Sequence, residues 1–206
     1  MEKGIVVKMS KVSFKPGNML YPLPVVMVSV ADKEGHSNII TVAWAGTICT
    51  NPPMVSISVR PERYSHHFIE ETGEFIINLT TKELCRATDY CGVRSGREVD
   101  KWKEMNLTPV MGKAVNVPYI EECPVHIECK VADIQRLGSH DMFIANVVAV
   151  EVDDKYMDKN QSFNLALAEP IVYSHGEYYQ MGQKLGKFGY SVQKKRSKKS
   201  LTRKKT

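Results

Sequence analysis

Short runs rich in β-branched residues recur along most of the chain, and clusters of turn-forming residues separate them. Residues 24–30 and 39–44 form two such runs around a turn cluster at residues 32–35, which predicts a β-hairpin. Apolar and polar side chains alternate in residues 54–60, as is typical of a strand with one buried and one polar face. Further strand signals lie at residues 75–79, 123–135, 142–152, 171–174 and 177–180. A mainly β fold is therefore expected.

Helical signals interrupt these strands. We predict that Ser65 caps a short helix that stops at Gly73, and that Thr81 caps a second helix ending at Gly92. A single helical turn is expected at residues 100–105. Strands in meander order with inserted helices predict a closed or nearly closed antiparallel barrel, Greek-key-like in its connections. The regular alternation of strands and crossover helices is missing, which argues against a parallel nucleotide-binding sheet.

One domain is expected over residues 1–192, because 206 residues with 43% hydrophobic content suit a single core. Residues 194–206 contain eight Lys or Arg and no acid. Subtracting these eight charges from the overall +5 leaves the rest of the chain at −3. Residues 193–206 are predicted to be a disordered basic tail, because they lack apolar content for a core. The tail is either a solvated extension or a contact for an acidic partner or nucleic acid.

Other features of the composition bear on location. No apolar run approaches the roughly 20 residues that a membrane-spanning helix needs, and the first residues lack the pattern of a secretory signal. The five cysteines are an odd number and widely spaced, which favours reduced thiols over a disulfide framework. We expect a soluble, cytoplasmic protein without membrane contacts.

The residues from Arg60 to His67 offer a way to hold a phosphate. The Gly-rich dinucleotide fingerprint and the phosphate loop ending in Lys-Ser/Thr are both absent. This segment instead leaves a strand and enters a helix, whose first free N–H groups and positive dipole end can bind an anion. Its Arg and Ser side chains can add charge and hydrogen bonds. Alternatively, it is a solvated connection.

A zinc site at Cys123, His126 and Cys129 is disfavoured. In a strand, the two cysteines lie on one face and His126 on the other, so they cannot reach one metal ion. The close Cys-x-x-Cys pairs of zinc modules are also missing. We expect no metal.

Several motifs occur together in a recognisable order. They are Thr-Val-Ala-Trp at 41–44, Asn-Pro-Pro at 51–53, Arg-x-x-Arg-Tyr-Ser-His at 60–66, Phe-Ile-Ile-Asn-Leu at 75–79, Gly-Ser-His-Asp at 138–141 and Glu-Pro-Ile-Val-Tyr at 169–173. With them, residues 15–192 resemble the flavin-reductase-like family, and in particular its flavoredoxin-like branch. The resemblance implies an FMN-binding split β-barrel, usually a homodimer with non-covalent FMN near the subunit interface.

The resemblance also assigns roles to residues. Thr41, Val42, Ala43, Trp44 and Thr47 would line the isoalloxazine ring; Ser58, Val59 and Arg60 would border the ribityl chain; and Arg63, Tyr64 and Ser65 would hold the phosphate. Asn78 lies in an apolar strand, where a buried amide needs partners that either the flavin or the neighbouring backbone can supply.

His140 is the candidate for catalysis. The matching turn of the family's reductases lies over the flavin where nicotinamide docks, and an imidazole there can orient the donor or assist a proton transfer. This chain has Ser139 where many reductases carry Asp. From spacing alone, a histidine in a turn is more often simply exposed.

Two functions follow as expectations. The first is an oxidoreductase that passes electrons through FMN, either a reductase using NADH or NADPH or a carrier fed by a redox partner protein. The second is a non-catalytic flavin storage or sensor protein that uses the basic tail for an acidic partner.

Overall fold

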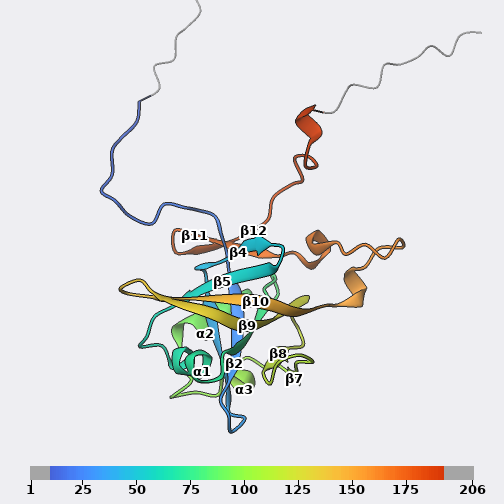
Figure 1. Ribbon diagram of the computed structural model, residues 1–206. Helices are drawn as coiled ribbons and strands as arrows, with labels where there is room; N and C mark the ends of the chain where they lie inside the picture. The colour runs from blue at the N-terminus through green and yellow to red at the C-terminus, as the bar shows by residue number, and fades with distance from the viewer. Residues whose placement is uncertain (1–9, 193–206) are drawn as a thin grey trace, which may run out of the picture.

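The structure, a computed structural model, describes residues 10–192 (Figure 1). Its main sheet has seven antiparallel strands in the spatial order β3-β2-β6-β9-β10-β5-β4. These strands are β2 Val26–Ala31, β3 Ser37–Val42, β4 Ala45–Thr50, β5 Pro53–Val59, β6 Glu74–Leu79, β9 Val125–Arg136 and β10 Asp141–Val152. The prediction of a mainly β, antiparallel fold is confirmed. The predicted basic tail, residues 193–206, lies outside the described residues.

The seven strands curl into a nearly closed barrel because the two end strands are consecutive in the chain. Only Ala43 and Trp44 lie between β3 and β4. The backbone N–H of Ser58 donates to the carbonyl of Trp44 at 2.8 Å, which joins this connection to β5. We call the Ala43–Trp44 connection the seam of the barrel.

The core fills the inside of the barrel. Alternate residues of the strands point inward, as the pleat requires, and helix α1 (Tyr64–Thr72) adds Phe68 and Ile69. The strand residues of this cluster are Val26, Val28, Val30, Ile40, Val42, Val55, Ile57, Val59, Phe75, Ile77, Cys129, Phe143 and Ala145. Met27 and Ile39 point outward instead, into a second apolar cluster with α2 (Cys85–Val93) and α3 (Lys101–Glu104). Both faces of β2 and β3 are therefore buried.

Smaller elements complete the fold. A second sheet has the order β1-β11-β12, from Leu23–Pro24, Ile171–Ser174 and Glu177–Gln180. Strands β7 (Pro109–Met111) and β8 (Pro118–Ile120) pair, and 3₁₀ turns lie at Asp154–Tyr156, Leu165–Ala168 and Tyr190–Val192. The described segments before β1 and after β12 extend from the same side of the barrel (Figure 1). Among the described helices, none has the length and apolar character to cross a membrane.

The structure corrects three local predictions. The run predicted at residues 39–44 ends at Val42, and a separate strand, β4, follows it. Ser65 does not cap α1: the N-cap position is Arg63, and the Ser65 hydroxyl accepts a hydrogen bond from Asn38 at 2.9 Å. Helix α2 begins at Cys85, four residues after Thr81, and Gly92 lies inside its last turn.

Candidate functional site

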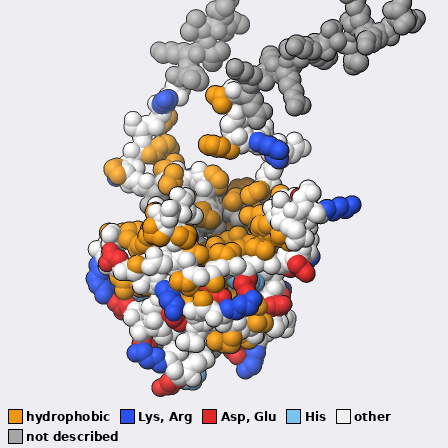
Figure 2. All heavy atoms as spheres, turned by 45° about the vertical axis from the view of Figure 1, so that its right-hand side comes forward, with side chains coloured by type: hydrophobic (Ala, Val, Ile, Leu, Met, Phe, Trp, Pro, Cys, Tyr) orange, Lys and Arg blue, Asp and Glu red, His pale blue; other side chains and the backbone are white. Residues whose placement is uncertain are grey.

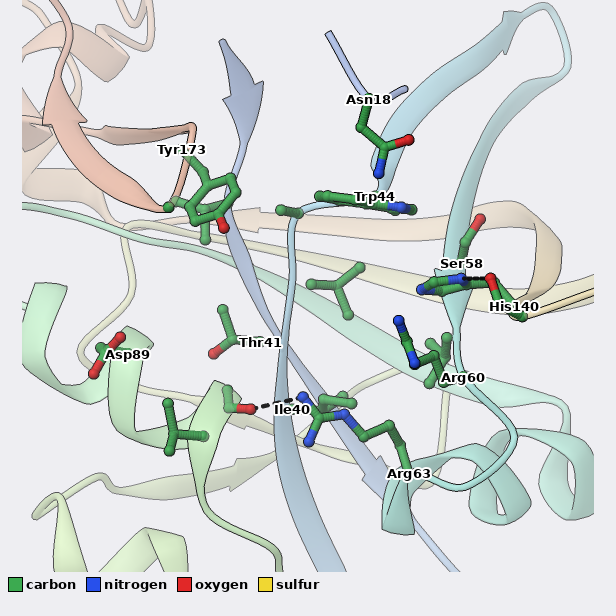
Figure 3. Close-up of a pocket in the computed structure, with 18 of the residues that line it drawn as sticks. Asn18, Ile40, Thr41, Trp44, Ser58, Arg60, Arg63, Asp89, His140 and Tyr173 are labelled. Carbon is green, nitrogen blue, oxygen red and sulfur yellow. Dashed lines mark hydrogen bonds between the residues drawn. The ribbon is translucent and has the colours of Figure 1, made fainter. Parts of the chain in front are cut away.

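A hollow with a volume of about 640 Å³ lies beside the seam of the barrel. We call it the first pocket. Its walls come from β3, β5, the end of α2, the turn between β9 and β10, and the β11–β12 hairpin (Figure 3). The lining residues are Asn18, Val25, Ile40, Thr41, Val42, Ala43, Trp44, Ser58, Val59, Arg60, Arg63, Asp89, Gly92, Val93, Ser139, His140, Tyr173, Gly176 and Tyr178.

One wall of the first pocket is the free edge of β3. This strand pairs only with β2, so its other edge has backbone N–H and C=O groups available to a ligand. The side chain of Thr41 is turned away to α2, where its hydroxyl donates to the Thr88 carbonyl. A planar, heteroatom-rich ring therefore has backbone hydrogen-bonding groups at its rim, along a strand edge whose Ile40 and Val42 side chains pack into the core.

His140 forms the opposite wall. Its ring lies nearly parallel to the Trp44 indole, with 6.4 Å between ring centroids and 20° between planes. The Ser139 hydroxyl lies 2.9 Å from His140 Nδ1. Partial burial, and then the positive charge of Arg60, lower the pKa of His140, which favours a neutral imidazole at pH 7. This imidazole can therefore donate or accept a hydrogen bond at the pocket wall.

A second pocket of about 310 Å³ continues from the first, and the two share Ile40 and Arg63. Its lining residues are Asn38, Ile40, Glu62, Arg63, Tyr64, Ser65, Cys91, Arg94, Ser95, Gly96, Arg97, Glu98 and Lys101. Four of these carry positive charge against two acids. The first turn of α1 borders the pocket, and the side chain of its N-cap residue, Arg63, makes no capping hydrogen bond within residues 10–192. The second pocket thus has the charge and the free N–H groups for an anion.

Lys101 is the least expected cation in the second pocket, because it is only 3% exposed. Its Nζ donates to the carbonyls of Ile39 and Cys91 at 2.7 and 2.8 Å, and no ion pair to a carboxylate is found for it within residues 10–192. Burial lowers the pKa of Lys101 to about 8. A buried lysine without an acidic partner is costly, and a bound anion would offset that cost.

Arg63 lies where the two pockets meet. Its Nη2 donates to the Gly92 carbonyl at the end of α2 at 2.9 Å (Figure 3). This bond holds the guanidinium across the gap between α1 and α2. The site therefore suits an elongated ligand with a flat end in the first pocket and an anionic end in the second.

The structure brings most of the predicted site residues together. Thr41, Val42, Ala43, Trp44, Ser58, Val59, Arg60, Arg63 and His140 line the first pocket. Tyr64 and Ser65 line the second, with Arg63. Thr47 lies apart, exposed on the edge strand β4, and lines neither pocket.

Asn78 also lies apart, in the centre of a buried hydrogen-bond network. Its Nδ2 donates to the Met27 and Ile76 carbonyls and to the Ser29 hydroxyl. Its Oδ1 accepts from the Ile120 N–H and from His126 Nδ1, each at 3.0 Å. Burial lowers the pKa of His126 to about 4, so the ring is neutral and its proton lies on Nδ1 to serve this bond. Protein groups therefore satisfy Asn78 without a ligand.

Sequence reasoning missed residues that reach the site from distant segments. Arg94, Arg97 and Lys101 follow α2, and Tyr178 comes from β12, where its hydroxyl donates to Asp89 at 3.1 Å. The density of basic residues at 94–101 was the available signal for the first three. Tyr178 lies in the motif Gly-Glu-Tyr-Tyr at 176–179, which also belongs to the family resemblance, but it was assigned no role in the site.

Known proteins resemble this chain over most of its length. The model of the flavin reductase like domain matches residues 18–182. Flavoredoxin of Desulfovibrio vulgaris is 31% identical, with a TM-score of 0.83 over 89% of this chain and 100% of that one. Flavoredoxin of Methanosarcina acetivorans is 25% identical, with a TM-score of 0.81 over 90% of this chain and 100% of that one. An uncharacterized protein of Archaeoglobus fulgidus is 32% identical over 70% of this chain and 81% of its own length.

Proposed function

This chain belongs to the flavin reductase like domain family, and from that premise we propose that it is an oxidoreductase that binds FMN non-covalently. The observation that carries the proposal is the continuity of the two pockets across Arg63. The first has a free strand edge, and Trp44 and His140 among its lining residues, for an isoalloxazine ring. The second has four cations and an uncapped helix N-terminus for a phosphate.

Bound FMN would supply the hydride and electron-transfer chemistry of the reaction. The protein's part is to bind and orient. Arg63 and the N-terminus of α1 hold the phosphate, and Lys101 adds a buried charge beside it. The free edge of β3 fixes the ring by hydrogen bonds, and Trp44 covers one side of the first pocket. His140 lies across from these groups and orients the electron donor or moves a proton.

Anaerobic titration tests the cofactor and the reaction together. The full chain is purified, supplied with FMN and freed of unbound flavin, and its visible spectrum is followed as NADH and then NADPH is added. We expect a bound flavin spectrum that bleaches within seconds with one of the nucleotides. Slow bleaching, with rapid reduction by a low-potential protein donor, would identify the carrier form of the same function. A colourless protein without FMN affinity contradicts the proposal.

We also propose that a second copy of this chain covers the apolar surface near the seam. A third hollow of about 540 Å³ adjoins the first pocket there, lined by Gly17, Asn18, Met19, Leu20, Tyr21, Leu23, Trp44, Ala45, Gly46, Ser56 and Ser58. Figure 2 shows apolar side chains gathered around this side of the molecule, below the two terminal segments. Phe14, Leu20 and Phe188 are almost fully exposed on those segments. Such a large exposed apolar surface is typical of an interface.

Sedimentation velocity of the full chain tests the assembly. We expect the mass of two 23.3-kDa chains, because burying the apolar segments favours association. Leu20→Glu should shift the protein to the monomer. Met111→Glu is the control, because Met111 is also exposed but lies on β7, outside the third hollow. A monomeric wild type, or equal effects of the two substitutions, would refute the dimer.

A further inference from the structure

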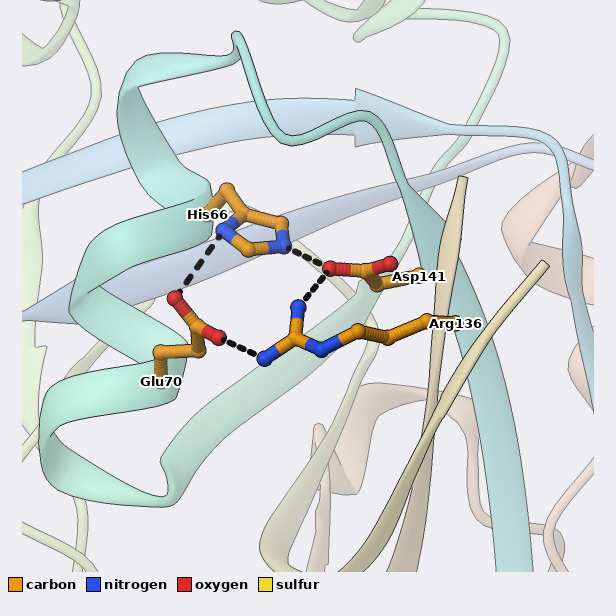
Figure 4. Close-up of polar contacts among 4 residues, drawn as sticks. All are labelled: His66, Glu70, Arg136 and Asp141. Carbon is orange, nitrogen blue, oxygen red and sulfur yellow. Dashed lines mark hydrogen bonds and ion pairs between the residues drawn. The ribbon is translucent and has the colours of Figure 1, made fainter. Parts of the chain in front are cut away.

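Four polar side chains form a closed network behind the wall that carries His140 (Figure 4). Arg136 donates through Nη1 to Asp141 at 2.6 Å and through Nη2 to Glu70 at 2.7 Å. His66 Nε2 lies 2.8 Å from the same Asp141 oxygen, and its Nδ1 lies 3.6 Å from Glu70. Every member therefore contacts two others. We call this set the clamp.

The clamp is already neutralised by an arginine. The ligand atoms of His66, Glu70 and Asp141 lie within 4.8 Å of one another, close enough for a metal ion. The guanidinium of Arg136 contacts both carboxylates and takes the position of the cation (Figure 4). A planar guanidinium suits two carboxylates in this way, because its N–H groups point in fixed directions. The cluster is therefore a structural connection and not a metal site.

The clamp joins two elements that the site uses. Arg136 ends β9 and Asp141 begins β10, directly opposite each other across the strand pair. Between them lies the turn of residues 137–140, closed by a hydrogen bond of 2.9 Å from the Leu137 N–H to the His140 carbonyl. His66 and Glu70 lie one helical turn apart on α1. The clamp thus ties the base of the turn to the helix.

The position of His140 depends on that base. His140 is the residue next to Asp141, whose carboxylate is buried in the clamp, at 3% exposure. Asp141 also pairs with Val59 of β5, which lines the first pocket. Gly138 has φ of 84°, and a Cβ added there would meet nothing within 4 Å beyond its chain neighbours. The polar contacts of the clamp are made at the base of the turn, by Arg136 and Asp141.

We propose that Arg136 is a positioning residue that acts through His140: by holding the base of the turn to α1, it fixes the imidazole opposite Trp44. This inference rests on the proposed function, because it concerns the reaction of the FMN site. Arg136 itself lines neither pocket. It should therefore affect the reaction and leave FMN affinity unchanged.

A double-mutant cycle tests whether the effect passes through His140. Arg136→Gln removes both ion pairs, and we expect flavin reduction by the preferred nicotinamide nucleotide to slow about tenfold, as small misplacements of reacting groups do. In a His140→Ala background, Arg136→Gln should cause no further loss, because the residue that it positions is gone. Arg136→Lys should recover part of the rate. Arg86→Gln, on the exposed face of α2, is the matched control and should be neutral.

Amide hydrogen exchange gives a readout without flavin. In the FMN-free full chain, residues 137–140 should exchange faster in Arg136→Gln than in the wild type or in Arg86→Gln. Unchanged exchange, or equal slowing of reduction in both backgrounds, would overturn the inference. So would a wild type that binds FMN but is reduced by neither nucleotide, since His140 then has no donor to orient. A wild type that binds no FMN refutes the proposed function itself.

Discussion

Gly96→Ala should weaken FMN binding about 10- to 100-fold, the equivalent of an overpacking cost of about 1–3 kcal/mol. An added Cβ would lie 2.2 Å from Oδ1 of Asn38, and the other amide atoms of Asn38 lie within 3.0 Å. Asn38 is buried and donates to the Ser65 hydroxyl, so its amide has little room to move. The displacement would reach both sides of the second pocket. Isothermal titration of FMN into each protein measures the effect.

Two further variants show whether the clash is the cause. Gly182→Ala is the control for adding a methyl group, because nothing lies within 4 Å of its added Cβ. Asn38→Ala combined with Gly96→Ala should recover part of the affinity, because it removes the amide that the new methyl group meets. Undiminished affinity in the single variant would show that the loop at residues 94–97 adjusts freely and does not shape the phosphate end.

Asn78→Leu should lower the free energy of unfolding by about 3–5 kcal/mol, as breaking a buried hydrogen-bond network does. Leucine has a similar shape but no polar atoms. The N–H of Ile120 and Nδ1–H of His126 would lose their acceptor, and the Ser29 hydroxyl would lose its donor. Each is buried, and an unsatisfied buried group costs about 1–3 kcal/mol. Urea denaturation of the flavin-free protein measures the change.

The matched control is Asn146→Leu, on β10. Asn146 is also an asparagine within a strand of the main sheet, but its side chain is exposed. The same substitution there should change the unfolding free energy by less than about 0.5 kcal/mol. Equal losses at the two positions would mean that the change in strand propensity, and not the buried network, is responsible.

The strands were predictable where the residues of a single segment carry the pattern of a strand. The alternation in β5 is typical of a strand with one buried face, the β-branched runs of β2 and β3 are typical of strands buried on both faces, and the structure has strands there. Strand β4 was missed because it begins with Ala45 and Gly46, which have weak strand preference. Pairing with β5 determines that this segment is extended, and such pairing is not visible in local sequence.

At the start of α1, local sequence also fails to predict the partner of one side chain. A serine before an apolar run is a typical cap signal. The Ser65 hydroxyl instead accepts from Asn38, which lies far away in sequence on β3. A cap rule considers only neighbours along the chain, so it cannot detect this competitor.

The part of the site that comes from one continuous segment of the chain was predictable. Residues from Thr41 to Ser65 supply the seam, β5 and the first turn of α1, which lie together because the chain runs directly through them. Lys101 and Tyr178 arrive from other elements, and burial of a lysine is against its usual preference. Lys101 and Tyr178 reach the site only through tertiary packing, and the composition and periodicity of their own segments do not predict that packing.

The seam has a consequence for how the binding site comes into existence. Trp44 both joins the last strand to the first and lines the first pocket, so the cavity has no wall there until the barrel is closed. The other walls come from segments as far apart in sequence as Asn18 and Tyr178. A fragment that lacks any of these segments therefore lacks a wall of the cavity, and cofactor capture has to follow closure of the barrel. A bound cofactor then stabilises the folded protein, because it binds the folded state and not the unfolded chain.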